Sequence, residues 1–188
     1  MGENRLRHKW PSTTAVIPVD FKGVPVEILE AAAARGTEVH NAAALYAQGL
    51  FVPRFSLPDR EGYFESFKAW FNQYVKEVIC VEAEFISTDF NYVSHIDLVC
   101  RLTDYRRVVV DYKTPAIVSK TWRLQLASYR HVFIEELKRG GATDLQVDCM
   151  SLRLMKDGKK AKALYYDEKL QDFPVFLSCL NVYRFFNS

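Results

Sequence analysis

The residues best suited to chemistry lie in two short segments of this sequence, HIDLV at 95–99 and VDYKT at 110–114. Alternate side chains of a β-strand share a face, so we expect Asp111 and Lys113 to point the same way at the end of a buried apolar strand. A buried charge is costly unless it is paired or bound to a metal. If the preceding strand pairs with this one, Asp97 can approach the same point.

Two carboxylates that converge on one point offer the hard oxygen ligands that Mg²⁺ or Mn²⁺ prefers. A metal held there could activate a water molecule and stabilise charge on a phosphate. Lys113 could orient the attacking water or offset negative charge in the transition state. The same three residues are also compatible with a structural ion pair between Asp111 and Lys113 beside an unrelated Asp97, because the D-x-K pattern is short.

The segments around these residues indicate the elements that position them. Short β-branched segments predict strands at 78–88, 92–102, 107–114 and 145–155, with 161–166 as a hairpin partner of the last. Helices are expected at 26–49, 61–75, 121–138 and 168–186. In the first of them Gly36 is expected to separate two helices and Gly49 to end the second, whereas residues 1–25 are expected to form an irregular, partly extended arm. This order predicts a single α/β domain over residues 1–188, with a mixed central sheet flanked by helices.

Composition and charge limit the class of protein. The chain has 188 residues, 49% of them hydrophobic, which is enough for one substantial core, and its net charge of +2 permits a nucleic-acid partner without demanding one. None of the four cysteines sits in a CxxC pair, so we expect buried thiols without disulfides. The sequence has no signal-peptide pattern and no apolar run of the ~18 residues that a membrane span requires. We therefore expect a cytoplasmic or otherwise intracellular protein with no membrane partner.

Four segments occur in an order and at a spacing that resemble the RecB-like branch of the PD-(D/E)XK nucleases. They are GTEVH at 36–40, IDL at 96–98, VDYKT at 110–114 and QLASY at 125–129, and PSTT at 11–14 resembles a further short motif of several relatives. This branch includes CRISPR-associated adaptation nucleases and a mitochondrial genome-maintenance exonuclease. The resemblance implies a restriction-endonuclease-like fold, with a catalytic core at about 36–166 and a C-terminal helix at about 168–186.

The resemblance also implies a metal site with one or two Mg²⁺ or Mn²⁺ ions. The implied ligands are His40, Asp97, Asp111 and the backbone carbonyl of Tyr112. Lys113 would be the catalytic lysine. Some relatives carry a set of cysteines for an iron–sulfur cluster, and because that set is missing from this sequence we expect no such cluster.

Further residues are implied around the metal site. Gln125 and Tyr129 share one face of a helix, and in the family that face lies over the active site, where the pair would contact the substrate backbone or support the catalytic residues. Relatives also place a Glu upstream of the first Asp, and Glu82 fits that spacing better than Glu84, although an exposed polar face of the strand would explain both glutamates equally well. Relatives usually have a Gly two residues before this Asp, where the present chain has Ser94-His95-Ile96-Asp97; His95 could be an extra polar group at the site or could face solvent.

Together these features predict a metal-dependent DNA nuclease, either an exonuclease or an end-processing enzyme of recombination, repair or replication. The sequence has no Walker A motif, so any unwinding or processivity would come from an oligomer or from a partner such as a helicase or recombination protein. Two alternatives stay open: a restriction-like endonuclease, and a catalytically inactive DNA-binding or assembly protein on the same fold.

Overall fold

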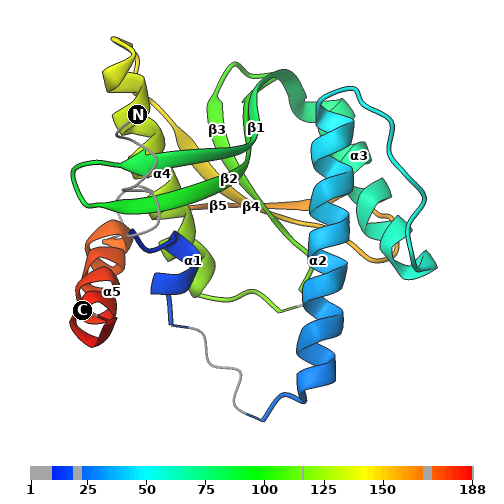
Figure 1. The fold of residues 1–188 in the computed structure, drawn as a ribbon. Helices are drawn as coiled ribbons and strands as arrows, with labels where there is room; N and C mark the ends of the chain where they lie inside the picture. The colour runs from blue at the N-terminus through cyan, green and yellow to red at the C-terminus, as the bar shows by residue number, and fades with distance from the viewer. Residues whose placement is uncertain (1–9, 19–22, 116, 167–170, 188) are drawn as a thin grey trace, which may run out of the picture.

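A computed structural model describes residues 10–18, 23–115, 117–166 and 171–187 of the chain. Its helices are α1 (Thr13–Val16), α2 (Val26–Ala47), α3 (Glu61–Tyr74), α4 (Thr121–Arg139) and α5 (Asp172–Asn187), with a 3₁₀ turn at Pro58–Arg60 before α3. Its strands are β1 (Val75–Ser87), β2 (Tyr92–Leu102), β3 (Arg107–Lys113), β4 (Asp148–Arg153) and β5 (Lys162–Tyr166). Figure 1 shows these elements in place.

The five strands form one mixed sheet in the order β1-β2-β3-β4-β5. All neighbours are antiparallel except β3 and β4, which are parallel and are connected through α4. A parallel pair needs such a crossover because its second strand must start at the same edge as the first. The predicted α/β class, with a mixed sheet flanked by helices, is confirmed.

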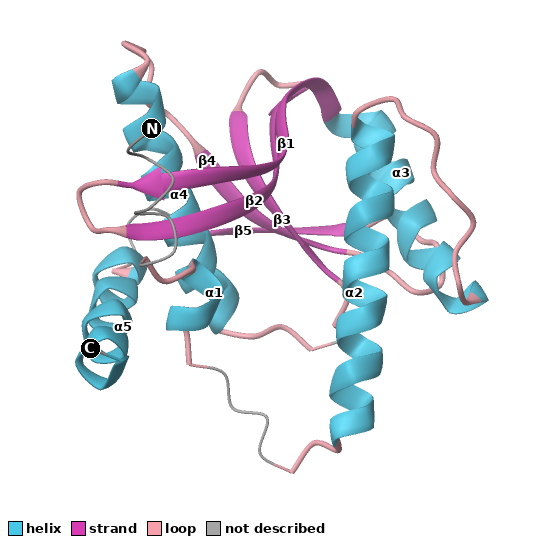
Figure 2. Ribbon diagram, viewed as in Figure 1, coloured by secondary structure: helices cyan, strands magenta, loops and turns pink. Residues whose placement is uncertain are grey.

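The sheet is packed on both faces, so the helices divide into two layers (Figure 2). The first core lies between the sheet and α2 and α3, and includes Val39, Phe67, Leu98, Val110 and Tyr112. The second core lies on the other face under α1, α4 and α5, and its members include Val16, Ile96, Val99, Leu126 and Phe176. Apolar area buried on both faces is the main stabilising term in such a three-layer arrangement.

The regular alternation of side chains is interrupted at one point of the β1–β2 hairpin. Ile96 packs in the second core, yet Leu98, two residues later, packs in the first. Opposite this point, Glu82 of β1 has a φ of 45°, in the left-handed region that a residue with a side chain rarely adopts. The pairing of Val81 with Leu98 and of Ala83 with Ile96 places Glu82 across from Asp97. At these two acidic residues the alternation of side chains between the sheet faces is interrupted, so that apolar side chains on either side of them point into different cores.

Several boundaries differ from the sequence-based expectation. Gly36 does not separate two helices: α2 is one continuous helix, because a single glycine lowers helix stability only modestly among alanine-rich neighbours. The helix ends at Ala47, and Gly49 follows with a φ of 71°, as expected of a stop. β1 begins at Val75, directly after α3, rather than at 78, and β4 is shorter than the expected 145–155.

The N-terminal segment is also more ordered than expected. Instead of a wholly irregular arm, residues 13–16 form the short helix α1, whose N-cap Ser12 accepts a hydrogen bond from the Ala15 amide through its side chain. Thr13 and Val16 are buried against the sheet. The expected start of the last helix at 168 lies outside the described residues, which resume at 171.

The structure bears on two further expectations, the state of the cysteines and the absence of a membrane span. None of the four cysteines, all within the described residues, forms a disulfide, but only Cys100 and Cys149 are buried as expected, whereas Cys80 and Cys179 are partly exposed. Among the helices that the structure describes, none combines the length and the apolar character needed to cross a bilayer.

Gly62 tests the packing of α3 against the β4–β5 connection. A Cβ atom at this position would overlap the backbone carbonyl oxygen of Lys156 and lie 2.7 Å from its carbonyl carbon. We expect Gly62→Ala to lower the free energy of unfolding by about 2 kcal/mol or more, because backbone must move to admit the methyl group. Urea denaturation measures this change.

Gly36→Ala is the matched control, since a Cβ atom there meets no atom within 4 Å. The same substitution within α2 is expected to raise the free energy of unfolding by about 0.5–1 kcal/mol. If both variants changed stability in the same direction, the result would contradict the close approach of the Lys156 backbone to Gly62.

Candidate active site

The site begins where the β2–β3 ladder ends. The last paired residues are Leu98 and Val110, and beyond them the two strands separate. The carboxylate of Asp97 then takes the place of a strand partner: its Oδ2 accepts a hydrogen bond of 2.7 Å from the backbone N–H of Tyr112. Burial works to raise the pKa of Asp97, but His40 and this backbone donor hold the pKa below its ordinary value. Asp97 is therefore a buried carboxylate that stays ionised.

His40 of α2 bridges the same two groups. Its Nε2 lies 3.0 Å from the carbonyl oxygen of Tyr112 and donates to it, while its Nδ1 lies 3.4 Å from Oδ2 of Asp97. Burial lowers the pKa of His40, but the negative charges of Asp97 and Asp111 outweigh that effect and raise the pKa to about 9. In the absence of a metal the imidazolium supplies the positive charge between the carboxylates.

Glu82, His40 and Asp97 form a group of three side chains that could bind a metal, which we call the three-ligand group. One ligand atom from each of these side chains lies within 4.8 Å of the others. The left-handed backbone of Glu82 turns its carboxyl to this point. Partial burial and the charge of Asp97 raise the pKa of Glu82 to about 7. Glu84 is elsewhere, 3.5 Å from the exposed His95.

Asp111 lies beside this group and is held by Lys113. The Lys113 Nζ is 2.6 Å from Oδ2 of Asp111. Burial and the neighbouring charge of Asp97 raise the pKa of Asp111 to about 6, although the ammonium of Lys113 opposes that shift. The sequence-based set of ligands is therefore divided: His40, Asp97 and the Tyr112 carbonyl contact one another, whereas Asp111 makes its ion pair with the lysine.

A chain of hydrogen bonds from α4 fixes the lysine. Lys113 Nζ donates to Oε1 of Gln125 over 2.9 Å, and Nε2 of Gln125 donates to the hydroxyl of Tyr129 over 2.7 Å. The ammonium also lies 5.8 Å from the centre of the Trp122 ring. The predicted i, i+4 pair thus lies beside the site and contacts it through the lysine, since neither side chain makes a hydrogen bond to the three-ligand group.

The donor set fits a divalent cation. Carboxylates of Glu82 and Asp97 with a backbone carbonyl are hard oxygen donors, and His40 adds a nitrogen. Burial is the main cause of the raised pKa values of Glu82 and Asp111, and the negative charge of Asp97 adds to both shifts. A bound cation would offset that charge. Next to Asp111 on β4, the buried hydroxyl of Ser151 has no hydrogen-bond partner among the described residues.

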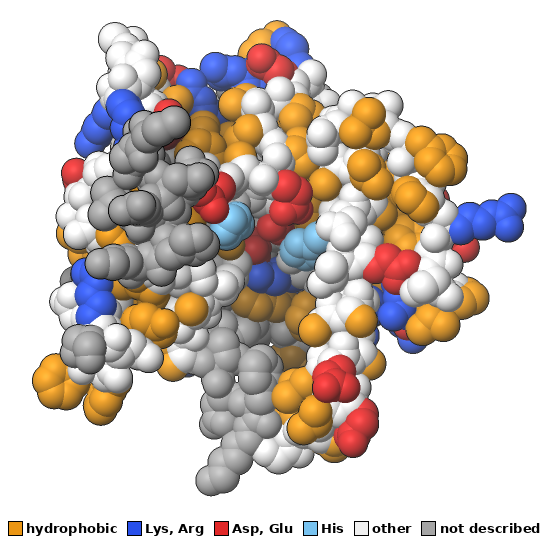
Figure 3. Space-filling model, in the orientation of Figure 1, with side chains coloured by type: hydrophobic (Ala, Val, Ile, Leu, Met, Phe, Trp, Pro, Cys, Tyr) orange, Lys and Arg blue, Asp and Glu red, His pale blue; other side chains and the backbone are white. Residues whose placement is uncertain are grey.

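The group opens to solvent between the hairpin and α2. Figure 3 shows acidic, histidine and basic side chains together in a hollow at the middle of this face. Thr37, His40 and Asn41 of α2 line it together with Glu82. The sequence analysis assigned no role to Thr37 or Asn41, although Thr37 lies in the GTEVH segment and the i, i+4 spacing of the two residues places them on one face of the helix.

The N-terminal PSTT motif at 11–14 is linked to β2 and α4 near the site by hydrogen bonds between hydroxyl groups. Thr13 of α1 shares a hydrogen bond of 2.7 Å with Ser94, and Ser128 of α4 donates to Thr13 over 3.1 Å. Ser94, which stands where relatives of the resembled family usually have Gly, is fully buried in this network. The network ties α1 and α4 to β2 just before Asp97.

Comparison with known proteins adds no assignment. The chain matches no family in a scan of known protein families, and no curated protein matches it.

His40 makes the stability of the metal-free protein depend on pH. Its pKa is higher in the folded state, about 9, than the ordinary value of 6.5. The stabilisation is therefore complete below pH 6.5 and is lost as the pH rises to about 9. We expect the free energy of unfolding in a chelator to fall by about 1–3 kcal/mol over this range, since one pKa unit corresponds to about 1.4 kcal/mol.

Urea denaturation at a series of pH values measures this loss. His40→Gln keeps a donor for the Tyr112 carbonyl but cannot titrate, so its stability should lack the loss between pH 6.5 and 9. His95→Gln, at an exposed histidine, should behave as the wild type does. A wild-type profile without the loss would contradict the charge assigned to His40.

Proposed function

We propose that this chain is a metal-dependent nuclease that hydrolyses phosphodiester bonds of DNA, with an exonuclease or end-processing activity. One observation carries the proposal: three ligands, His40, Glu82 and Asp97, meet beside a lysine that is itself held by Asp111 and Gln125. A structural ion pair alone needs neither the excess of carboxylates nor the second tether on the lysine. Phosphodiester hydrolysis uses both, because it needs a cation for the phosphate and a cationic donor near the attacking water.

Mg²⁺ or Mn²⁺ bound by Glu82, Asp97 and His40 would lower the pKa of a coordinated water and neutralise charge on the phosphate. The Tyr112 carbonyl and the Asp111 carboxylate are the neighbouring oxygen atoms that could serve as further ligands of this cation. Asp97 has two duties, since it also accepts the Tyr112 amide and so fixes the end of β3. The position of the cation is thereby tied to the position of Lys113.

Lys113 is the group placed to act on the substrate. Its ammonium carries three donors, of which one points to Asp111 and one to Gln125. The remaining donor is available to orient a water molecule or to contact a phosphate oxygen. Holding the lysine at two points reduces the entropy lost when it makes that third contact.

Asp111→Asn and Lys113→Met test the proposed chemistry. Each is expected to lower the cleavage rate of end-labelled DNA by at least about a hundredfold, because each removes a charge from the reacting centre. The assay uses linear and closed circular DNA, single- and double-stranded, with Mg²⁺ or Mn²⁺ and with a chelator. Cleavage of linear DNA alone would support the end-dependent activity, and cleavage of closed circles would favour an endonuclease.

Asp104→Asn and Lys138→Met are matched controls at exposed positions away from the site; both should retain wild-type rates. Cleavage that survives both substitutions at the site would remove Asp111 and Lys113 from the mechanism. A pure wild-type protein that cuts none of these substrates with either metal would overturn the proposed function.

Gln125 acts as a positioning residue for Lys113. We expect Gln125→Ala to lower kcat about tenfold with little change in KM, because the lysine loses one tether while the remaining contacts of the substrate persist. Tyr129→Phe removes only the hydroxyl that Gln125 contacts and should cause a smaller loss in kcat. Steady-state kinetics on the cleaved substrate measure both.

Thermal unfolding of the two variants separates positioning from folding. If the loss of activity followed a lower melting temperature, or appeared in KM alone, the role assigned to Gln125 would be wrong.

A further inference from the structure

A groove with unpaired basic side chains begins one residue beyond Lys113. Its volume is about 210 Å³, and it runs past the ends of β3 and β4 towards the start of α3. We call it the cationic groove and define it by Tyr63, Thr114, Arg153 and Lys156 among its lining residues. Thr114, which lines it, directly follows Lys113 in the chain.

Arg153 stands next to Lys113 across the parallel pair of strands. The two residues are register partners of β3 and β4, and the amide of Leu154 donates to the carbonyl of Lys113 over 2.8 Å. Leu152 and Leu154 pack in the first core, so Arg153 between them extends from the opposite face, as Lys113 does. Neighbouring strands lie roughly 4.8 Å apart, so the two cations emerge side by side.

Among the residues that the structure describes, no carboxylate forms an ion pair with the two cations that line this groove. The side chain of Arg153 is partly buried and makes no hydrogen bond or ion pair with any residue that the structure describes, and the side chain of Lys156 likewise has none within the described ranges. Asp157 lines the groove, but Lys159 lies 2.7 Å from it and offsets its charge. The guanidinium of Arg35 adds a third cation, 5.5 Å from the centre of the Tyr63 ring.

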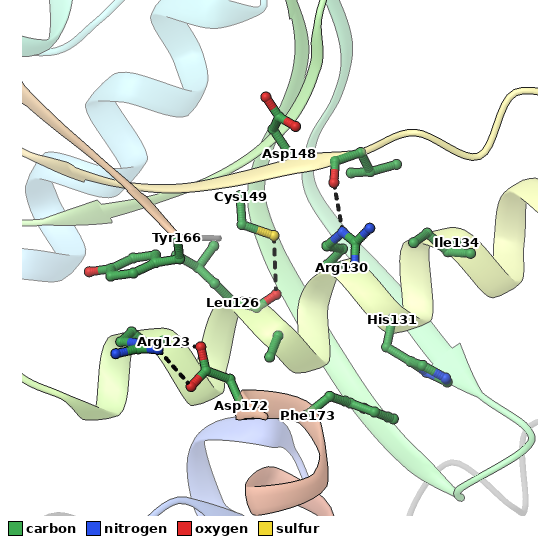
Figure 4. A pocket seen from close by; sticks show the side chains of 12 residues that line it. Arg123, Leu126, Arg130, His131, Ile134, Asp148, Cys149, Tyr166, Asp172 and Phe173 are labelled. Atoms are coloured by element: carbon green, nitrogen blue, oxygen red, sulfur yellow. Dashed lines mark hydrogen bonds and ion pairs between the residues drawn. The ribbon is translucent and has the colours of Figure 1, made fainter. Parts of the chain in front are cut away.

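Several other arginines of the domain already have partners. Figure 4 shows the far side of α4, where Arg123 pairs with Asp172 and Arg130 donates to the carbonyl of Val147. Arg106 pairs with Asp104 and Asp148 at the opposite end of the sheet. A partly buried guanidinium without such a partner is costly in the unliganded protein, and an anionic ligand would remove that cost.

We propose that the cationic groove binds the sugar–phosphate backbone of a nucleic-acid strand, with Arg153 contacting the phosphate adjacent to the one at Lys113. The inference rests on the proposed function, because it assigns the phosphate at Lys113 to the scissile bond. It adds the direction in which the strand leaves the active site, from Lys113 past Thr114 and Arg153 towards Lys156. A chain of phosphates fits this row of cations, whereas a single phosphate monoester would use Lys113 alone.

Strand binding can be measured without cleavage. Fluorescence anisotropy of a labelled single-stranded DNA oligonucleotide, in a chelator and over a range of salt concentrations, gives the affinity and its salt slope. We expect Arg153→Ala to weaken binding about five- to tenfold and to reduce the slope by roughly 0.7, the value for one phosphate contact on a single strand. Arg139→Ala removes the same charge at the far end of α4 and should change neither quantity.

A second measurement locates the contact. In the cleavage assay, a neutral methylphosphonate is placed at the phosphate on either side of the scissile one. At one of these positions the wild-type protein should show a raised KM, and Arg153→Ala should show no further rise there, because the contact is already lost. The melting temperature of Arg153→Ala should equal that of the wild type within a few degrees.

The outcomes separate this inference from the proposed function. Unchanged affinity, salt slope and methylphosphonate sensitivity in Arg153→Ala would overturn the groove assignment even if the wild type cuts DNA. Wild-type protein that binds no strand would overturn it as well. Protein that binds through Arg153 but cuts no DNA with either metal would support the groove and reject the nuclease.

Discussion

The hydrogen bond from the Tyr112 amide to the Asp97 carboxylate is the contact on which the site depends. It joins β2 to β3 at the point where the regular ladder has ended, and it uses a buried charge to do so. His40 closes the arrangement from α2 by contacting both partners. An ionised group in this position requires compensation from several sides, and the surrounding donors provide it. Both core layers and the hairpin therefore converge on one carboxylate.

The same arrangement places two charged groups side by side, the three-ligand group and the ion pair of Asp111 with Lys113. On one side of Tyr112, three ligands gather with more negative than positive charge; on the other, Asp111 and Lys113 nearly neutralise each other. The pKa values do not follow this division, because burial and individual partners set each of them. His40 and the Tyr112 amide hold the pKa of Asp97 below its ordinary value, whereas burial raises the pKa values of Glu82 and Asp111 above theirs. A site built this way holds its lysine in place before any ligand arrives, which is the preorganisation that electrostatic catalysis needs.

Local periodicity was sufficient to predict part of the site. Asp111 and Lys113 share a strand face, and Gln125 and Tyr129 share a helix face, so the hydrogen-bond chain from β3 to α4 follows from spacing once the crossover is assumed. Non-local geometry was not predictable in this way. The position of Glu82 depends on a left-handed residue inside a strand, and the reach of His40 depends on an unbroken α2 that Gly36 was expected to interrupt. Strand alternation and helix-breaking tendencies are average rules, and here tertiary packing overrides both.

The left-handed backbone of Glu82 also bears on how such a sequence could change over time. A residue with a side chain is less stable than glycine in that conformation by about 1 kcal/mol or more, so a lineage selected only for a durable fold would be expected to drift towards glycine there. Keeping glutamate sacrifices some conformational stability for a carboxyl at the mouth of the site. Position 82 is thus subject to two opposing selective pressures, one for stability and one for the carboxyl group. A chain that had lost the activity could accept glycine there, while Val81 and Ala83 still paired with β2.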